Sequence, residues 1–227
     1  MQITKNQSKA LEILKENQLD VFTLNDIMLL LNLNKSKTYN LIKSLKKNDI
    51  IEKIKGHYCL KGTDEMVTAS RAVFPSYISF LSALNYYGLT DQFPIRITLI
   101  STKKHTHKDY IIATVNRNKF FGYTNVNNIT IAEKEKAVID SLYLPKYAGG
   151  IKTIMGCFEH KLDKKTLYEY AVKMDNKAVL RRLGYITDIL NIKFPYKLKI
   201  GKGYELLDPS KPKKNNYNKK WLLDVNI

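Results

Sequence analysis

The sequence predicts an α+β protein made of two domains. With 227 residues, the chain is longer than the ~150 residues of a common single domain. Hydrophobic residues make up 44% of it, which is enough to build folded cores. Helical and strand-like patterns follow one another without the regular repeat of a parallel α/β fold. We expect a first domain over residues 1–62, a connector over 63–75, a larger α+β domain over 76–208 and a basic tail over 209–227.

The first 62 residues predict three helices followed by a hairpin. The expected helices span residues 5–17, 24–31 and 35–48. Thr23 can cap the second helix, because its hydroxyl can accept a backbone N–H that the first turn leaves unpaired. Asn32, Leu33 and Asn34 predict a tight turn, since asparagine tolerates the left-handed backbone conformation. Gly56 separates two strand-like runs, residues 50–55 and 57–61, as the tip of a short hairpin does.

Residues 76–208 predict a mixture of helices and strands. Pro75 marks a boundary, and Gly88 has the position of a C-terminal helix cap. The run from Ile95 to Leu99 alternates apolar and polar residues, as a strand with one solvated face does. The expected helices cover residues 76–87, 133–144, 152–159, 164–174 and 177–191, and the expected strands cover 95–99, 110–115, 119–123 and 129–131, with a closing hairpin over 196–200 and 204–207. The lysine-rich residues 209–220 predict a loose tail.

Composition narrows the class of protein. The 38 basic and 21 acidic residues give a formal charge of +17, which favours a polyanionic partner. Only five of the basic residues are arginines, so the codon usage of an AT-rich genome is a second explanation for part of this charge. The chain has no apolar run of the ~20 residues that cross a bilayer and no apolar signal segment at its start, which predicts a cytoplasmic protein without membrane contact.

The expected helix over residues 35–48 has the two faces that a DNA-reading helix needs. Leu41, Ile42 and Leu45 fall on an apolar face, and polar and basic residues occupy the other. Recognition helices read bases from their N-terminal part and contact phosphates further along. A solvated helix face is the alternative. The expected base contacts are Lys35, Ser36, Lys37 and Asn40, and the expected phosphate contacts are Lys43, Ser44 and Lys47, with Lys53, Lys55 and His57 contributed by the hairpin.

These elements together resemble a winged helix domain. The resemblance is carried by the segments Leu31–Tyr39, Leu41–Leu45, Asn48–Ile51 and Gly56–Tyr58. It implies a fold in which one helix enters the major groove and the hairpin lies beside it. It does not define the target sequence.

Four later segments carry a second resemblance. Tyr77–Leu89, Thr98–Lys104, Phe121–Tyr123 and Glu135–Tyr143, in this order, resemble the C-terminal domain of AbiEi-type antitoxins. With the winged helix, the resemblance covers about residues 5–190. It implies a repressor that binds inverted repeats of double-stranded DNA in its own two-gene operon. It also implies an antitoxin of a type IV toxin–antitoxin system for phage abortive infection.

The partner implied by this family is a nucleotidyltransferase toxin, which the antitoxin counteracts without needing a stable complex. Two copies are expected on the operator, and the state in solution stays open. A winged-helix regulator with a ligand-sensing C-terminal domain is the alternative, and a DNA-processing enzyme is a second one. Arg181 and Arg182 are adjacent on one expected helix, so at least one should be exposed and could add a second basic surface.

The sequence predicts no catalytic residue, cofactor or metal. His105 and His107 have metal-ligand spacing, but a third ligand is not evident. Lys103, Lys104 and Lys108 beside them predict a solvated loop. Two Asp-x-Lys elements at Asp163 and Asp175 could suggest a nuclease, but both lie where helix caps are expected. Glu133, Glu135 and Asp140 share one expected helix, where a favourable position near its N-terminus and ordinary solvation explain them.

Overall fold

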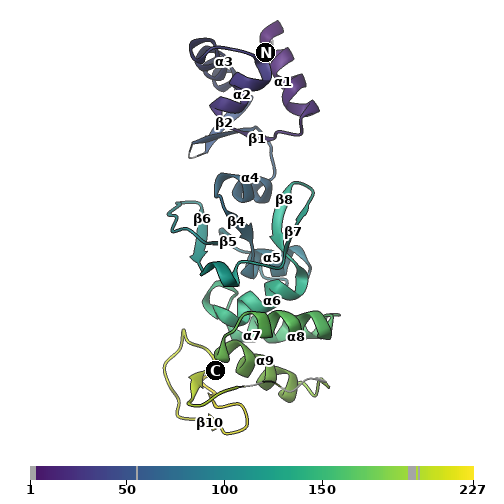
Figure 1. The fold of residues 1–227 in the computed structure, drawn as a ribbon, viewed down its shortest axis with the longest axis vertical. Helices are drawn as coiled ribbons and strands as arrows, with labels where there is room; N and C mark the ends of the chain where they lie inside the picture. The colour runs from purple at the N-terminus through teal and green to yellow at the C-terminus, as the bar shows by residue number, and fades with distance from the viewer. Residues whose placement is uncertain (1–3, 55, 194–197, 199) are drawn as a thin grey trace. The chain divides into compact units, whose positions relative to one another are not determined.

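The computed structural model describes residues 4–54, 56–193, 198 and 200–227 (Figure 1). In these residues the protein is a mixed α+β structure, as the sequence predicts. The chain divides into two compact units, Met1–Phe74 and Pro75–Ile227. Among the described residues, no helix has both the length and the apolar character needed to cross a membrane.

The first unit contains three helices and a small sheet, followed by a fourth helix. The elements are α1 (Lys5–Glu16), β1 (Val21–Phe22), α2 (Leu24–Leu31), α3 (Lys35–Lys47), β2 (Ile51–Ile54), β3 (His57–Leu60) and α4 (Glu65–Ala72). The strands form an antiparallel sheet in the order β1-β3-β2. The three helices and the hairpin confirm the predictions to within one or two residues, whereas the two-residue strand β1 was not expected.

Local signals explain why the helices begin and end where they do. Thr23 caps α2, because its hydroxyl accepts the N–H of Asp26 while the Asp26 carboxylate accepts the N–H of Thr23. Asn32 ends α2 in the left-handed conformation with φ 49°, which confirms the predicted turn. The side chain of Asn34 then accepts the N–H of Lys37 at 2.9 Å and begins α3.

The core of the first unit lies between its three helices and the sheet. Its fully buried side chains are Leu14, Phe22, Ile27, Ile42, Leu45 and Ile51. These residues come from α1, β1, α2, α3 and β2, so the core fixes α3 in place along its apolar face. The polar face of α3 is left on the outside.

Residues 63–75, expected to be a connector, contain a helix of the first unit. Asp64 begins α4 by accepting the N–H groups of Met66 and Val67 at 2.7 and 3.3 Å. Val67 and Ala69 are buried, and α4 contacts β1. The eight-residue helix was missed because its few apolar residues give no clear periodicity in the sequence.

The second unit contains a five-stranded sheet and five α-helices among its described residues. The strands β4 (Ser76–Ile78), β5 (Ile97–Ser101), β6 (Tyr110–Thr114), β7 (Tyr123–Val126) and β8 (Ile129–Ala132) have the order β6-β5-β4-β8-β7. The helices are α5 (Phe80–Tyr86), α6 (Lys134–Tyr143), α7 (Ile151–Gly156), α8 (Lys164–Lys173) and α9 (Lys177–Ile189). Strand pairing is mixed: β4 is antiparallel to β5 and parallel to β8.

The central part of this sheet differs from the sequence prediction. Residues 76–78 form β4 instead of the first turn of a helix, and α5 begins only at Phe80. Thr98, expected to face solvent, is buried, and its hydroxyl donates to the Ser79 carbonyl at 2.6 Å. Because β5 lies between two strands and is covered on both faces, apolar–polar alternation does not report its exposure. The strand expected over 119–123 is displaced, because residues 117–119 form a 3₁₀ turn and β7 begins only at Tyr123.

Residues 209–227 are ordered, so the prediction of a loose tail is wrong. The strand β11 (Leu223–Asp224) pairs with β10 (Tyr217–Asn218) and, in parallel, with β9 (Glu205–Leu206). The expected second hairpin strand thus pairs with the C-terminal segment, while most of the first, over 196–200, lies outside the described residues. The buried amide of Asn226 donates to the carbonyls of Asp208 and Lys211 at 2.7 and 3.1 Å. These hydrogen bonds need partners distant in sequence, which the local composition cannot reveal.

We expect Gly184→Ala to displace this C-terminal segment. Gly184 is buried in α9, and three atoms of the Trp221 ring occupy the space that a Cβ would need. Overpacking against a rigid ring costs about 1–3 kcal/mol. Because Trp221 is the single tryptophan of the chain, a red shift of its fluorescence measures the displacement.

Gly156→Ala in α7 is the matched control, since a Cβ there would meet no described atom within 4 Å beyond its own chain neighbours and the nearby helix backbone. We expect it to leave the emission unchanged. Identical emission spectra for both variants would contradict the packing of Trp221 on α9.

Candidate nucleic-acid interface

The outer face of α3 brings most of the predicted DNA-contacting residues together. Thr38, Ile42 and Leu45 are buried on the inner face. At about 100° per residue, Ser36, Asn40, Lys43 and Lys47 lie on the side opposite this core. The exposed predicted residues of this helix are Lys35, Ser36, Lys37, Asn40, Lys43 and Lys47.

The electrostatic character of this face is uniformly basic. The helix contains five lysines and no acidic residue. Among the described residues, none of these lysines forms an ion pair. Lys46, which was not among the predicted contacts, is exposed in the last turn of the helix. A helix with this charge can approach a phosphate backbone without first breaking internal salt bridges.

Ser44 has a different position from the one predicted. It is half-buried, and its Oγ accepts a hydrogen bond of 2.7 Å from Nε2 of Gln7 in α1. Gln7 also accepts a 3.3 Å hydrogen bond from the side chain of Asn48. Ser44 therefore ties α3 to α1 as a hydrogen-bond acceptor, and it is less exposed than the lysines of the outer face.

A groove of about 580 Å³ lies beside this contact, between α3, α1 and the end of α2. Lys37 and Asn40 line its α3 side, and Asn6 and Lys9 line its α1 side. Lys37 is thus on the edge of the outer face and points toward α1. The position of Lys37 on the α1 side could have been predicted from the sequence, because Lys37 and Ser44 are separated by two helical turns and share a side of α3.

The hairpin contributes fewer described residues than predicted. Lys53 in β2 is exposed, and His57 in β3 is half-buried opposite Ile54. Gly56 adopts φ 82°, which favours glycine at the tip. Lys55 lies outside the described residues.

Tyr39 is an exposed aromatic residue on α3 that was not among the predicted DNA contacts. Its side chain is 52% exposed in the first half of the helix, where base contacts are expected. Its position could have been predicted from the sequence, because the helical period places Tyr39 outside the apolar face formed by Leu41, Ile42 and Leu45. An aromatic ring there can make apolar contact with a thymine methyl group.

The predicted second basic surface at Arg181 and Arg182 is wrong, because both side chains are buried. Arg181 is 1% exposed and donates to the carbonyls of Ile200 and Lys202 at 2.9 and 2.8 Å. Glu205 lies 3.9 Å from its guanidinium. These hydrogen bonds hold the chain that follows α9.

Arg182 connects two other parts of the second unit. It donates to the Leu142 carbonyl at the end of α6 and to the carbonyls of Leu206 and Leu207 in the C-terminal segment. Burial lowers the pKa of Arg182 to about 10, so it stays charged at neutral pH. The five donors of a guanidinium suit such a cluster of carbonyls, and they are not available to an external phosphate.

Asp140, expected to be solvated, belongs to a buried polar cluster in the second unit. Its Oδ1 forms a short ion pair with Lys136, one turn earlier on α6. Its Oδ2 accepts hydrogen bonds from Ser79 at 2.8 Å and Tyr77 at 3.1 Å. Burial raises the pKa of Asp140 and lowers that of Lys136, while their mutual attraction opposes both shifts. The cluster joins β4 to α6 and is closed to solvent.

Among the remaining residues that could take part in catalysis or metal binding, Asp163 caps a helix and both cysteines are buried. Asp163 caps α8 as predicted, whereas Asn176, not Asp175, caps α9. Burial raises the pKa of the Cys59 thiol to about 11 and that of Cys157 to about 12, so neither is a thiolate at neutral pH. In the part of the chain that the structure describes, no three His, Cys, Asp or Glu residues are grouped as a metal site.

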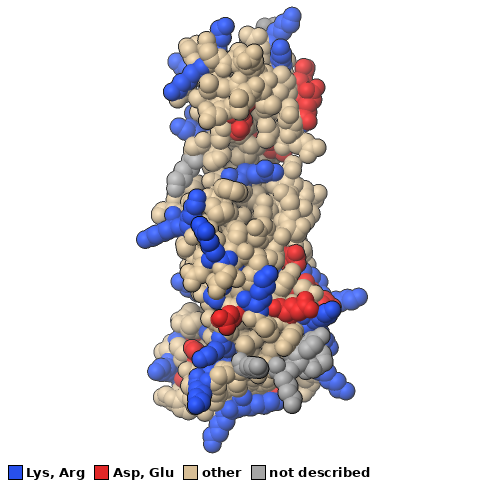
Figure 2. All heavy atoms as spheres, in the orientation of Figure 1, with Lys and Arg blue, Asp and Glu red and all other residues tan. Residues whose placement is uncertain are grey.

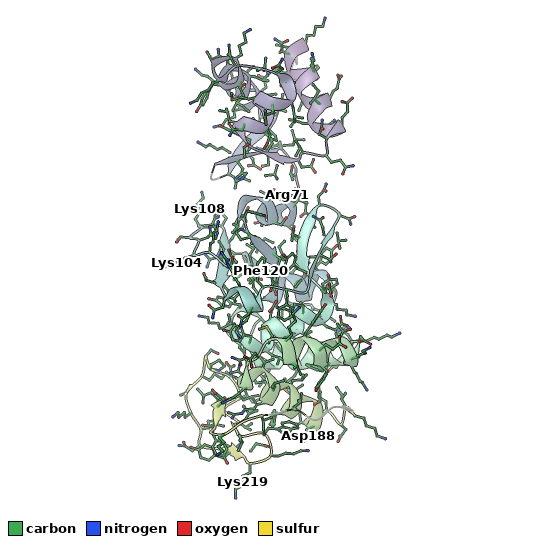
Figure 3. The ribbon with its side chains drawn as sticks, in the orientation of Figure 1. Arg71, Lys104, Lys108, Phe120, Asp188 and Lys219 are labelled. Carbon is green, nitrogen blue, oxygen red and sulfur yellow. The ribbon has the colours of Figure 1, made fainter. Side chains whose placement is uncertain are left out.

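The loop between β5 and β6 carries the other basic run of the sequence. Lys103, Lys104 and Lys108 are exposed, and Figure 3 shows Lys104 and Lys108 on this loop. Arg96 donates to the Lys108 carbonyl at 3.3 Å, and the ring of His107 stacks on Tyr110. The lysines are solvated, as predicted.

We compared the chain with protein-family models and with curated proteins. No protein-family model matches the chain, and no curated protein matches it significantly.

Proposed function

We propose that the first unit is a winged helix-turn-helix domain and that the protein represses its own operon by binding DNA. The order α2, turn and α3 followed by a hairpin supports this proposal, as does the β1-β3-β2 sheet. In such a domain α3 is the recognition helix, and the β2–β3 hairpin is the wing.

The observation that carries the proposal is the outer face of α3. It presents lysines, Ser36 and Asn40 on a helix that its own core holds rigid. Asparagine can pair with adenine through two hydrogen bonds, and lysine can reach guanine or phosphate. The acid-free surface favours a polyanion over a protein partner of mixed charge.

The antitoxin role is the second part of the proposal, and it rests on the resemblance to AbiEi-type antitoxins. In this proposal the second unit counteracts a nucleotidyltransferase toxin encoded beside the antitoxin, in the cytoplasm. Two copies of the chain occupy an inverted repeat. Because Arg181 and Arg182 are buried, we expect any basic contact surface of this unit to be formed by its exposed lysines.

Binding of the intact protein to its own upstream DNA tests the first part. We expect a labelled upstream fragment to shift in two steps, one for each half-site, in the presence of scrambled competitor. About four phosphate contacts give a salt slope of about −3.6, so affinity should fall about 10²-fold between about 50 and 200 mM salt. Fluorescence anisotropy at several salt concentrations measures this slope.

Equal affinity for upstream and scrambled DNA would contradict operator recognition, even with strong salt dependence. Co-expression with the protein encoded by the adjacent gene tests the second part. Failure to restore the growth of cells that express an active nucleotidyltransferase from that gene would argue against the antitoxin role.

A further inference from the structure

The C-terminal segment of the second unit carries a pair of exposed aromatic rings. Tyr204 and Tyr217 are 47% and 50% exposed, and their ring centroids lie 4.8 Å apart. They are 13 residues apart in sequence and meet because β9 and β10 flank β11. Aromatic rings that remain this exposed leave their faces available to a ligand.

The backbone holds this ring pair in place. Tyr217 belongs to β10 opposite Asp224, and its hydroxyl donates to the Asn215 side chain at 2.9 Å. Tyr204 directly precedes Glu205, whose N–H donates to the Leu222 carbonyl at 3.0 Å. The rings are therefore presented by paired backbone, which lowers the entropy cost of binding.

Four exposed lysines lie near the ring pair along the chain. Lys202 is two residues from Tyr204, and Lys219 is two residues from Tyr217. Lys211 and Lys213 lie in the loop between β9 and β10, and all four lysines are exposed. Figure 2 shows basic side chains gathered at this end of the second unit, and in Figure 3 Lys219 extends away from the ribbon.

The acidic residues of the segment do not cancel this charge. Asp208 and Asp224 are buried and accept hydrogen bonds from backbone N–H groups. Asp188 is paired with Lys220, and Glu205 is half-exposed near Arg181. Lys202, Lys211, Lys213 and Lys219 form no ion pair with any described residue.

We propose that Tyr204, Tyr217 and these four lysines form a binding site for single-stranded nucleic acid. Single strands expose base faces, which stack on aromatic side chains, while nearby lysines bind the phosphates. A duplex keeps its base faces stacked internally and cannot use the tyrosine rings. This surface is distinct from the α3 face, and its function does not depend on operator recognition.

Binding of the full-length protein to labelled oligonucleotides of 12 nucleotides tests the proposal. The probes are a single-stranded RNA, a single-stranded DNA and a duplex of one mixed sequence unrelated to the upstream DNA. Because the proposed α3 face also binds duplexes, this comparison is made in the variant Lys43→Ala/Lys47→Ala, in which we expect at least one single strand to bind more tightly than the duplex. Comparison of the RNA and DNA strands then identifies which nucleic acid the site prefers.

The variant Tyr204→Ala/Tyr217→Ala is expected to lose about 5-fold to 150-fold in affinity for that single strand, the equivalent of one stacked base. Tyr204→Phe/Tyr217→Phe keeps the rings and should bind like the original protein. Phe93→Ala removes an even more exposed ring, at 81%, from the loop before β5 and should also have no effect. Trp221 fluorescence verifies that each variant retains the folded C-terminal segment.

Lys43→Ala/Lys47→Ala on α3 separates this site from the proposed DNA-binding face. We expect this variant to lose operator affinity and to retain binding of the single strand. Unchanged single-strand affinity in the folded Tyr204→Ala/Tyr217→Ala variant would overturn the proposal, as would a preference of the Lys43→Ala/Lys47→Ala variant for the duplex.

Discussion

Replacing Lys37 and Asn40 together by alanine is expected to abolish the preference of the protein for its own upstream DNA. Each side chain that pairs well with a base contributes about 1–3 kcal/mol of discrimination against the wrong base. Loss of both therefore predicts a decrease of about 30-fold to 10⁴-fold in specific affinity. Both residues are exposed on α3, and neither supports the core of the first unit.

The measurement compares anisotropy titrations with upstream and scrambled DNA. Binding to scrambled DNA should fall only slightly, because Lys43, Lys46 and Lys47 remain. Lys43→Ala should instead weaken binding to both DNAs equally and reduce the salt slope by about one. Lys165→Ala, an equal loss of charge on the exposed side of α8, is the control and should change neither. If the Lys37/Asn40 variant still preferred upstream over scrambled DNA, α3 would not be the helix that recognises the operator sequence.

Asp140→Ala is expected to destabilise the second unit by about 3–5 kcal/mol. The substitution leaves the ammonium of Lys136 buried without its counter-charge, and it also removes the acceptor of the Ser79 and Tyr77 hydroxyls. Breaking a buried pair costs this much because the remaining charge stays desolvated. For a unit of about 150 residues, the melting temperature should fall by roughly 10 °C.

Two further variants distinguish this explanation from simple loss of a side chain. Lys136→Met/Asp140→Leu removes both charges and should recover a large part of the lost stability. Asp163→Ala removes an exposed helix cap and should cost only about 1 kcal/mol. Melting curves by circular dichroism measure all three. If the double variant were as unstable as Asp140→Ala, the unpaired charge would not be the cause.

The agreement between sequence and structure is best where the signal is local. Thr23 and Asn34 cap their helices through hydrogen bonds to residues three positions away, and Gly88 follows α5 with positive φ. Such contacts depend only on neighbours along the chain, so residue type and spacing suffice to predict them. The polar outer face of α3 follows in the same way from the periodicity of its apolar residues.

The disagreements concern residues whose environment is made by distant segments. Arg181 and Arg182 looked like an exposed basic pair, but carbonyls from residues 142–143 and 200–207 surround them. Asp140 looked solvated on a helix, but β4 brings Tyr77 and Ser79 against it. Nothing in the spacing of these residues distinguishes a buried charge with partners from an exposed one.

The sequence by itself determined the α+β class, most helix boundaries and the basic face of α3, because these depend on interactions within a few residues. Tertiary structure alone decided that β4 and β5 are covered on both faces, and that the C-terminal lysine-rich segment is ordered. It also brought Tyr204 and Tyr217 together. Burial and long-range pairing depend on which segments meet, and that follows from packing of the whole unit rather than from local preference.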